Sequence, residues 1–407
     1  MNHSAIDSRI EYGQDIPSSI KSGLLSLFCV ESLDQLSAAE IEAVKNSVQR
    51  LFRITGATDY DGFCKAYALY YLPVNFYKIW RPLLDLVLTD SLPVRGRILE
   101  LGAGPGSATF GLIEFFKCLA TENSTQSFSL DIVLVEKNAG FITVFEKLYS
   151  AYASSLPDNL VVSVKCIIDD AFAFLSQEKD SCYDLIIESN MLNPNESIME
   201  SRLSEFAEGL NRHMAKHASA ILIEPAKKEL TKTLRGAKKQ LLAVGLNCYS
   251  PCCCNNNECF QFASGRVDAE GIRLTQQLFD KGIITRQQKT HAFEYAVFRN
   301  DRISKHEYNG SDNVLSNLEN RAGEVIRFNA FILTTVDNGD HFSIKICDGS
   351  RPRSGDLWFD VPKSILVEKQ LNCLLAGRGG LVDVKDAVVV NSAKIGVTQK
   401  TRLKIYM

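Results

Sequence analysis

Three glycines at alternate positions stand out because they directly follow a short apolar run and precede a stretch with helical spacing. They are Gly102, Gly104 and Gly106, within the segment Arg97-Ile-Leu-Glu-Leu-Gly-Ala-Gly-Pro-Gly-Ser107. Glycine has no Cβ, so the backbone can turn sharply there and a ligand can approach its amides. The first turn of the following helix leaves N–H groups unpaired, which suits an anionic ligand. The segment predicts a strand, a turn and a helix that bind a nucleotide-like cofactor.

The spacing of these glycines distinguishes between cofactor classes. A dinucleotide-binding loop requires Gly or Ala where this chain has Ser107. The pattern Glu100-x-Gly102-x-Gly104-x-Gly106 instead resembles the S-adenosylmethionine (SAM) loop of class I methyltransferases. That resemblance implies a SAM contact for Glu100 and for each of the three glycines. The alternative is that the glycines only form a turn.

Acidic residues follow the next predicted strands. Glu136 ends the second strand, where class I methyltransferases place an acid that accepts both ribose hydroxyls. Its distance from the loop exceeds the usual separation of about 20 residues, and a polar insertion at 121–128 accounts for the difference. Asp169, Asp170 and Ala171 follow the third strand, where such enzymes contact the adenine.

The end of the fourth predicted strand marks the methyl-transfer region. Glu188, Ser189 and Asn190 are expected to line it. No catalytic side chain can be named, because the Asn193-Pro194 pair is not followed by the Pro-Tyr of aminomethylating enzymes. Methyl transfer by positioning alone fits this pattern, and so does SAM binding without transfer.

Five cysteines fall within a dozen residues, namely Cys248, Cys252, Cys253, Cys254 and Cys259. Thiolates this close favour a soft metal or an iron–sulfur cluster, and both need four ligands of suitable geometry. The segment is too compressed for an ordinary pair of C-x-x-C knuckles, so we expect a distant fourth ligand. Free thiols in a loop are the alternative.

The glycine and cysteine segments, in this order, resemble the methyltransferase-like proteins associated with the mitochondrial small ribosomal subunit and their bacterial relatives. The resemblance runs from about Tyr60 to the end of the chain. Its motifs are Ala66-Tyr-Ala-Leu-Tyr-Tyr-Leu-Pro-Val-Asn75, the loop at Gly102, Ile223-Glu224-Pro225, Ser250-Pro-Cys252, Cys259-Phe-Gln-Phe and Phe293-Glu-Tyr-Ala-Val-Phe-Arg299.

The resemblance implies a four-iron cluster (4Fe-4S) held by cysteines at matching positions, and a partner, the small ribosomal subunit or its rRNA. The matching ligands are Cys252, Cys254, Cys259 and Cys347. No Pro-His follows Cys252 and the middle spacing is short, so Cys253 is an alternative ligand and zinc an alternative metal. The chain is then a methyltransferase or an assembly factor. A non-catalytic RNA-binding module and a small-molecule methyltransferase are the other candidates.

The elements that position these residues change character along the chain. Residues 1–92 have helical spacing, and Pro73 is expected to kink or break a helix. Residues 93–300 alternate strands and helices, which predicts an α/β fold of the class I methyltransferase (Rossmann-like) type with a cysteine-rich insertion at 248–259. Residues 301–322 are predicted to be a linker, and 323–407 a small β-barrel of the OB type.

Six strands are predicted in the α/β region and five in the barrel. The six are Arg97–Leu101, Leu130–Glu136, Leu160–Ile168, Tyr183–Glu188, Ser219–Glu224 and His291–Phe298. The five are Arg327–Val336, His341–Cys347, Leu357–Val361, Leu381–Val390 and Thr398–Tyr406. Period-two alternation identifies the barrel strands.

Composition limits the class of protein. A net charge of −3 and a pI near 6.1 argue against non-specific nucleic-acid binding by the whole surface. Two local basic stretches remain as RNA-contact candidates or as solvated faces: 227–239, with five lysines and Arg235, and the last stretch of the barrel, with Lys394, Lys400, Arg402 and Lys404. No long apolar run or leader-like start is evident, so we expect a cytoplasmic protein without a membrane span.

Overall fold

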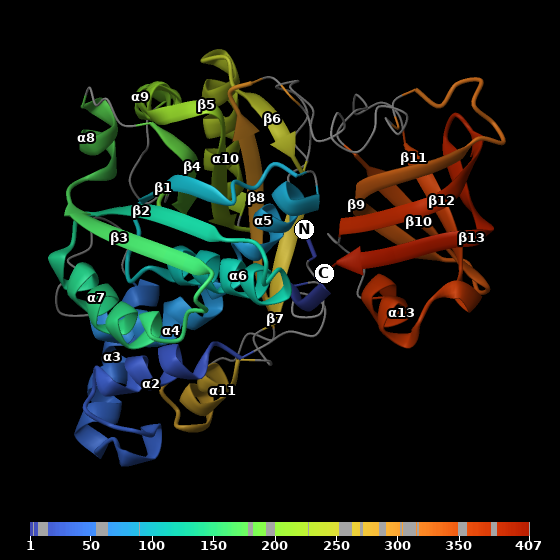
Figure 1. The fold of residues 1–407 in the computed structure, drawn as a ribbon. Coiled ribbons are helices and arrows are strands. Elements are labelled where there is room, and N and C mark those ends of the chain that lie inside the picture. The colour runs from blue at the N-terminus through green and yellow to red at the C-terminus, as the bar shows by residue number, and fades with distance from the viewer. Residues whose placement is uncertain are drawn as a thin grey trace.

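The chain forms a mixed α/β part followed by a β-barrel (Figure 1). The computed structural model describes residues 1–407 except 3, 7–14, 54–63, 89, 178–181, 193–199, 227, 252–262, 269–271, 285–289, 302, 304–314, 316, 349–355, 376–380 and 407. Most of the predicted linker falls among these exceptions, so the linker stays a prediction. No helix in the described part of the chain is long and apolar enough to cross a membrane.

Helices dominate the first part of the chain, as the spacing predicted. They are α2 (Ser18–Ser26), η1 (Leu33–Gln35), α3 (Ala38–Arg53), α4 (Cys64–Phe76) and α5 (Trp80–Leu88). Of the kink or break expected at Pro73, the break is wrong, because α4 continues past it to Phe76. Pro73 is buried, and packing of this last turn offsets the hydrogen bond that proline cannot donate.

A mixed sheet forms the centre of the α/β part, in the order β3-β2-β1-β4-β5-β8-β6, with β7 pairing with β8. Its strands are β1 (Arg95–Leu101), β2 (Phe128–Glu136), β3 (Leu160–Ile168), β4 (Tyr183–Ser189), β5 (Met214–Pro225), β6 (Asn247–Ser250), β7 (Ala263–Asp268) and β8 (Thr290–Arg299). Strands β1 to β5 are parallel, whereas β8 is antiparallel to β5, β6 and β7. All six predicted strands are present, and β6 and β7 were missed.

Helices cover both faces of the sheet (Figure 1). They are α6 (Ser107–Glu122), α7 (Ala139–Ala153), α8 (Ala171–Ser176), α9 (Glu200–His213) and α10 (Lys228–Ala243), whereas α11 (Arg273–Asp280) packs on α4. One apolar cluster joins α6, α7 and the N-terminal helices to the sheet, and another joins α8, α9 and α10 to the opposite face. Strands buried on both faces explain the continuous apolar runs in β1, β2 and β4.

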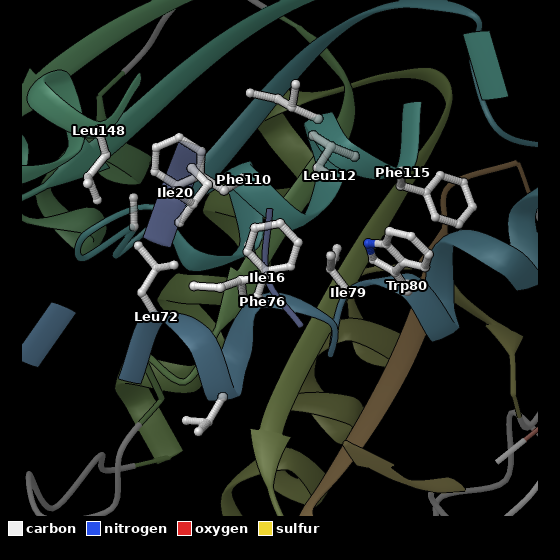
Figure 2. Close-up of a cluster of buried hydrophobic side chains, with 14 of the residues drawn as sticks. Ile16, Ile20, Leu72, Phe76, Ile79, Trp80, Phe110, Leu112, Phe115 and Leu148 are labelled. Atoms are coloured by element: carbon white, nitrogen blue, oxygen red, sulfur yellow. The ribbon is translucent and has the colours of Figure 1, made fainter. Parts of the chain in front are cut away.

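The N-terminal helices pack into the apolar cluster that contains α6 and α7. Figure 2 shows Phe76 and Trp80 facing Phe110 and Phe115 of α6. The Trp80 indole N–H donates a 2.8 Å hydrogen bond to the Gly111 carbonyl. A Cβ at Gly111 would lie 2.0 Å from the Phe76 carbonyl oxygen, so glycine permits this close approach of the two segments. Phe76 and Trp80 are therefore part of this core.

The last part of the chain is a closed five-stranded barrel with its own apolar core. Its elements are β9 (Val325–Asp337), β10 (His341–Cys347), β11 (Leu357–Pro362), η4 (Lys363–Ile365), α13 (Glu368–Leu375), β12 (Leu381–Asn391) and β13 (Lys394–Tyr406). Each predicted barrel strand overlaps one of these. Strands β11 and β13 pair in parallel, and this pairing completes the closure.

Candidate functional site

The glycine loop, residues 102–106, lies at the carboxyl edge of the sheet. Strand order reverses at this point, since β1 lies between β2 and β4, and in open α/β sheets ligands bind at such a reversal. Gly102, Gly104 and Gly106 have φ values of 62°, 54° and 84°. This left-handed backbone strains any residue with a Cβ, so the structure confirms the tight turn between strand and helix.

The three glycines differ in what surrounds them. A Cβ at Gly102 would lie 2.7 Å from Met191 Cγ, and one at Gly106 would lie 2.4 Å from Phe145 Cδ2. A Cβ at Gly104 would meet nothing within 4 Å. Packing therefore requires glycine at the outer two positions, while Gly104 faces open space that a ligand could occupy.

Glu136 of β2 is held beside Gly104. One carboxylate oxygen, Oε2, accepts the Gly104 N–H at 2.9 Å, and Oε1 accepts the Asn138 N–H at 2.9 Å. The side chain is only 7% exposed. Each oxygen keeps a further lone pair, so this carboxylate can also accept hydrogen bonds from a pair of hydroxyls.

Glu100 lies beneath the loop. It is 2% exposed, and its carboxyl group accepts a hydrogen bond from the Thr109 hydroxyl in the first turns of α6. Burial raises the pKa of Glu100 to about 8. The side chain thus ties β1 to α6 and supports the loop from inside.

The three predicted residues after β3 are Asp169, Asp170 and Ala171, and they make different contacts. Asp170 caps α8, since its Oδ1 accepts the Phe172 and Ala173 N–H groups at 3.0 and 3.2 Å. The Asp169 carboxylate accepts from the Gln177 amide at 3.1 Å, and its own N–H donates to the Glu136 carbonyl at 3.3 Å. Ala171 is 7% exposed. Asp169 therefore lies beside Glu136, within the same edge of the sheet.

Ser189 ends β4, and Asn190, which follows it, contacts a lysine from the N-terminal region. Asn190 has a φ of 61°, and its side-chain amide donates to Ser189 Oγ at 2.9 Å. Lys78, between α4 and α5, donates to Asn190 Oδ1 at 3.5 Å although it is only 5% exposed. The structure thus adds Lys78 to the predicted methyl-transfer region.

Two more polar residues at this edge were missed by sequence reasoning. Glu224, at the end of β5, is 1% exposed, and a charged residue ending an apolar strand was a signal that could have identified it. His291, in β8, has its Nε2 buried with no hydrogen-bond partner in the described part of the chain. Burial, with a contribution from Lys78, lowers the pKa of His291 to about 4, so its ring is neutral near pH 7.

The predicted metal ligands fall mostly outside the described residues. Cys252, Cys253, Cys254 and Cys259 belong to the segment 252–262, which is not described. Cys347 is described, and it ends β10 opposite Phe331 of β9. Within the described ranges no group of three or more His, Cys, Asp or Glu side chains could hold a metal ion. The cluster stays a prediction.

Basic side chains of the two candidate RNA surfaces differ in exposure. On α10, Lys232 and Lys239 are exposed, whereas Lys238 is only 4% exposed, so the predicted basic face is interrupted. On β13, Lys400, Arg402 and Lys404 are all exposed. Strand alternation places Arg402 and Lys404 on the same outer face of the barrel, while Lys400 lies in the irregular stretch of β13 just before them.

Comparison with known proteins gives likenesses of fold only. No family model matches the chain, and no curated protein matches it. Among solved structures, a SAM-dependent methyltransferase from Clostridium acetobutylicum ATCC 824 aligns with 59% of this chain and 98% of its own, at 12% identity and a TM-score of 0.34.

Two further solved structures with similarity to this chain are those of TrmN and NSun6. TrmN from Thermus thermophilus aligns with 56% of this chain at 12% identity and a TM-score of 0.33, and NSun6 from Pyrococcus horikoshii with 53% at 13% and 0.33. This chain spans about half the length of each, 52% and 51%. At identities and TM-scores this low, these likenesses concern the fold alone.

Proposed function

We propose that this chain is a class I methyltransferase-fold protein that binds SAM at the glycine loop. The observation that carries the proposal is open space above Gly104 directly beside the Glu136 carboxylate. The strand order supports it, because an antiparallel strand inserted between β5 and β6 is typical of class I methyltransferases rather than of all-parallel dinucleotide-binding sheets.

The residues present fit this cofactor. The Glu136 oxygens would accept the ribose hydroxyls, the carboxylate of Asp169 would lie near the adenine, and Gly104 would allow close backbone approach. SAM supplies an electrophilic methyl group when it is bound. Ser189, Asn190 and Lys78 offer hydroxyl, amide and ammonium groups that can orient an acceptor, so transfer by positioning requires no further nucleophile.

The proposed acceptor or partner is the small ribosomal subunit or its rRNA. Exposed Lys400, Arg402 and Lys404 on β13 support an RNA-contacting face. We also assign the barrel to the OB type, whose members commonly bind nucleic acid. Its strands run first, second, third, fifth, fourth around the barrel, with α13 between the third and fourth.

Transfer of a labelled methyl group tests the enzymatic form of this proposal. The full chain is incubated with labelled SAM and with small-subunit rRNA, immature small subunits or cell-extracted small molecules. Incorporation into the rRNA or the subunit, abolished by Gly104→Arg, is expected. Incorporation only into small molecules would overturn the proposed substrate class.

A non-catalytic assembly factor is the second candidate. The Asn190 amide is already engaged by Ser189 and Lys78, which favours a loop held for structural reasons. In this case the chain would bind immature small subunits, and Gly104→Arg would leave subunit maturation unchanged. Arrested maturation in that variant would instead support catalysis or a SAM-dependent role.

The iron–sulfur site is proposed on the donor set alone, since thiolates suit both a 4Fe-4S cluster and zinc. Cys252, Cys254, Cys259 and Cys347 would join the barrel to the α/β part, and Cys253 is the alternative to Cys254. Metal and sulfide analysis after anaerobic purification tests this. Iron and sulfide lost in Cys347→Ser would support the cluster, and stoichiometric zinc would contradict it.

A further inference from the structure

Two glutamates converge in the interior at the carboxyl ends of β4 and β5. Glu188 is 0% exposed and Glu224 is 1% exposed. Both accept the same backbone N–H, since Leu192 N lies 3.3 Å from Glu188 Oε1 and 2.9 Å from Glu224 Oε1. Glu188 Oε1 also accepts the Met191 N–H at 2.7 Å. The two carboxyl groups are therefore neighbours in a place without solvent.

Two ionised carboxylates are strongly disfavoured in such a place, because burial and mutual repulsion both oppose the second charge. One oxygen of the pair, Glu188 Oε2, is buried and has no hydrogen-bond partner in the described part of the chain. A proton on Glu224, donated to this oxygen, removes the repulsion and satisfies the atom at the same time. Burial raises the pKa of Glu188 to about 7, and burial together with Glu188 raises that of Glu224 well above its usual range.

We propose that Glu188 and Glu224 share one proton and act as a positioning pair that holds residues 189–192 over the glycine loop. This segment places Met191 against Gly102 and Asn190 within reach of Lys78. Releasing the Met191 and Leu192 amides would therefore disturb the glycine loop and the acceptor region together. Sharing of the proton is independent of any cofactor, whereas its effect on SAM affinity rests on the proposed function.

The charged groups around the pair are consistent with a single shared proton. The positive charge of Lys78 favours the ionised form of Glu224. With one proton on the pair, the charge of the single remaining carboxylate is balanced by the Lys78 ammonium. Glu294 of β8 is the partner of Glu224 across the β5–β8 ladder. Burial raises the pKa of Glu294, and hydrogen bonding from Thr231 and the charge of Arg235 oppose that rise. His291 is kept neutral by burial and adds no charge near pH 7.

Substitutions of Glu224 distinguish the effect of its proton from the effect of its carboxyl group. In Glu224→Gln, the amide nitrogen can donate permanently to Glu188 Oε2 while the amide oxygen accepts from Leu192. This variant should keep the segment in place at every pH, whereas Glu224→Ala leaves Glu188 unsatisfied. In the wild type both pKa values are raised, and that of Glu188, about 7, is the lower of the two. Above that pH the pair therefore holds the single shared proton, which it loses only as the pH rises through the higher pKa of Glu224.

Infrared spectroscopy of the full chain tests the shared proton directly. The spectra are recorded in a Glu100→Gln background, because Glu100 is another buried carboxyl group with a raised pKa. Above about pH 7 we expect the carbonyl stretch of one buried protonated carboxyl group, weakening only as the pH rises through the higher pKa of Glu224. The band should be missing when Glu224→Gln is added and retained when Glu205→Gln is added, a control on the exposed side of α9. A spectrum without such a titrating band overturns the proposal.

SAM titration then tests the positioning role. Wild-type affinity should fall by up to about tenfold per pH unit above the titration, while Glu224→Gln retains its affinity and Glu224→Ala is weak throughout. A parallel pH profile for wild type and Glu224→Gln contradicts the positioning role. If wild type binds no SAM, the proposed function fails, and the infrared result still decides whether the proton is shared.

Discussion

The carboxyl edge of the sheet and the β-barrel hold their charged side chains in opposite ways. At the sheet edge Glu100, Glu136, Glu188 and Glu224 are all 7% exposed or less. The barrel instead carries exposed basic residues on β13 and ion pairs such as Lys345–Asp356 and Lys363–Asp337 at its surface. Buried polar groups require matched partners, whereas surface charges contribute little individually.

This difference fits the two kinds of recognition that we propose for the chain. The sheet edge depends on geometry, because each buried carboxyl group has a defined hydrogen-bond partner that a small ligand must respect. The barrel offers charge on an outer face, which suits a polyanion and tolerates imperfect contacts. Changes at the sheet edge should therefore be severe and specific, and changes on the barrel mild and additive.

Glycine substitutions should show the largest contrast. Gly106→Ala places a Cβ 2.4 Å from Phe145 at a φ of 84°, so we expect it to lower the free energy of unfolding by about 2–4 kcal/mol. Gly339→Ala, in the β9–β10 turn, has a similar φ of 92° but open space. It should cost about 1 kcal/mol. Urea denaturation measures both losses, and equal losses would contradict a packing cost at Gly106 beyond the cost of its backbone conformation.

Removing the Glu136 carboxylate should be the next largest effect, and it concerns SAM binding. Glu136→Ala removes acceptors for the ribose hydroxyls and for the Gly104 N–H, which should weaken SAM binding by about 10- to 100-fold, or about 1.4–2.8 kcal/mol. Glu324→Ala removes an exposed barrel carboxylate that pairs with Arg321. SAM titration should find this control unchanged, and a comparable loss would refute the assignment of Glu136.

The buried Glu100 carboxyl should make stability depend on pH. Its pKa is raised from the ordinary value of 4.5 to about 8, so the stability it contributes is fully present below about pH 4.5 and is lost progressively as the pH rises toward and through 8. Glu100→Gln mimics the protonated form. We expect the wild type, but not this variant, to lose about 1 kcal/mol of unfolding free energy between pH 7 and pH 8. Identical pH profiles in urea denaturation would show that Glu100 is not protonated in the fold.

Charge removal on β13 should have the smallest effect. The double change Arg402→Ala with Lys404→Ala should weaken RNA binding a few-fold and reduce the slope of log affinity against log salt by about 2. SAM affinity should not change. Lys147→Ala, an exposed lysine on α7, is the matched control for charge. An unchanged salt slope in the double variant would show that Arg402 and Lys404 of β13 do not contact RNA phosphates.

The sequence predicted much of the fold because local patterns carry it. Apolar runs bounded by glycine or acidic residues placed the six main strands, and Glu136 was identified at the end of β2 despite the insertion before it. Strands β6 and β7 were missed because both are short and flank the cysteine segment. The expected break at Pro73 failed because burial outweighed the lost hydrogen bond.

The site itself was only partly predictable. Which glycine faces open space depends on Met191 and Phe145, which pack from other elements. Lys78 reaches Asn190 across 112 positions of sequence, and no local pattern indicates such a contact. The antiparallel insertion of β8 places Glu294 opposite Glu224, which is a property of the assembled sheet.

Calorimetric titration of the full chain with SAM tests the central claim most directly. The wild type should bind SAM saturably at one site, and Gly104→Arg should bind it at least about 100-fold more weakly, a loss of about 2.7 kcal/mol. Gly339→Arg, which places the same side chain in open space on the barrel, should retain wild-type affinity. Equal affinity in wild type and Gly104→Arg, or no binding by the wild type, would contradict a SAM site at the glycine loop.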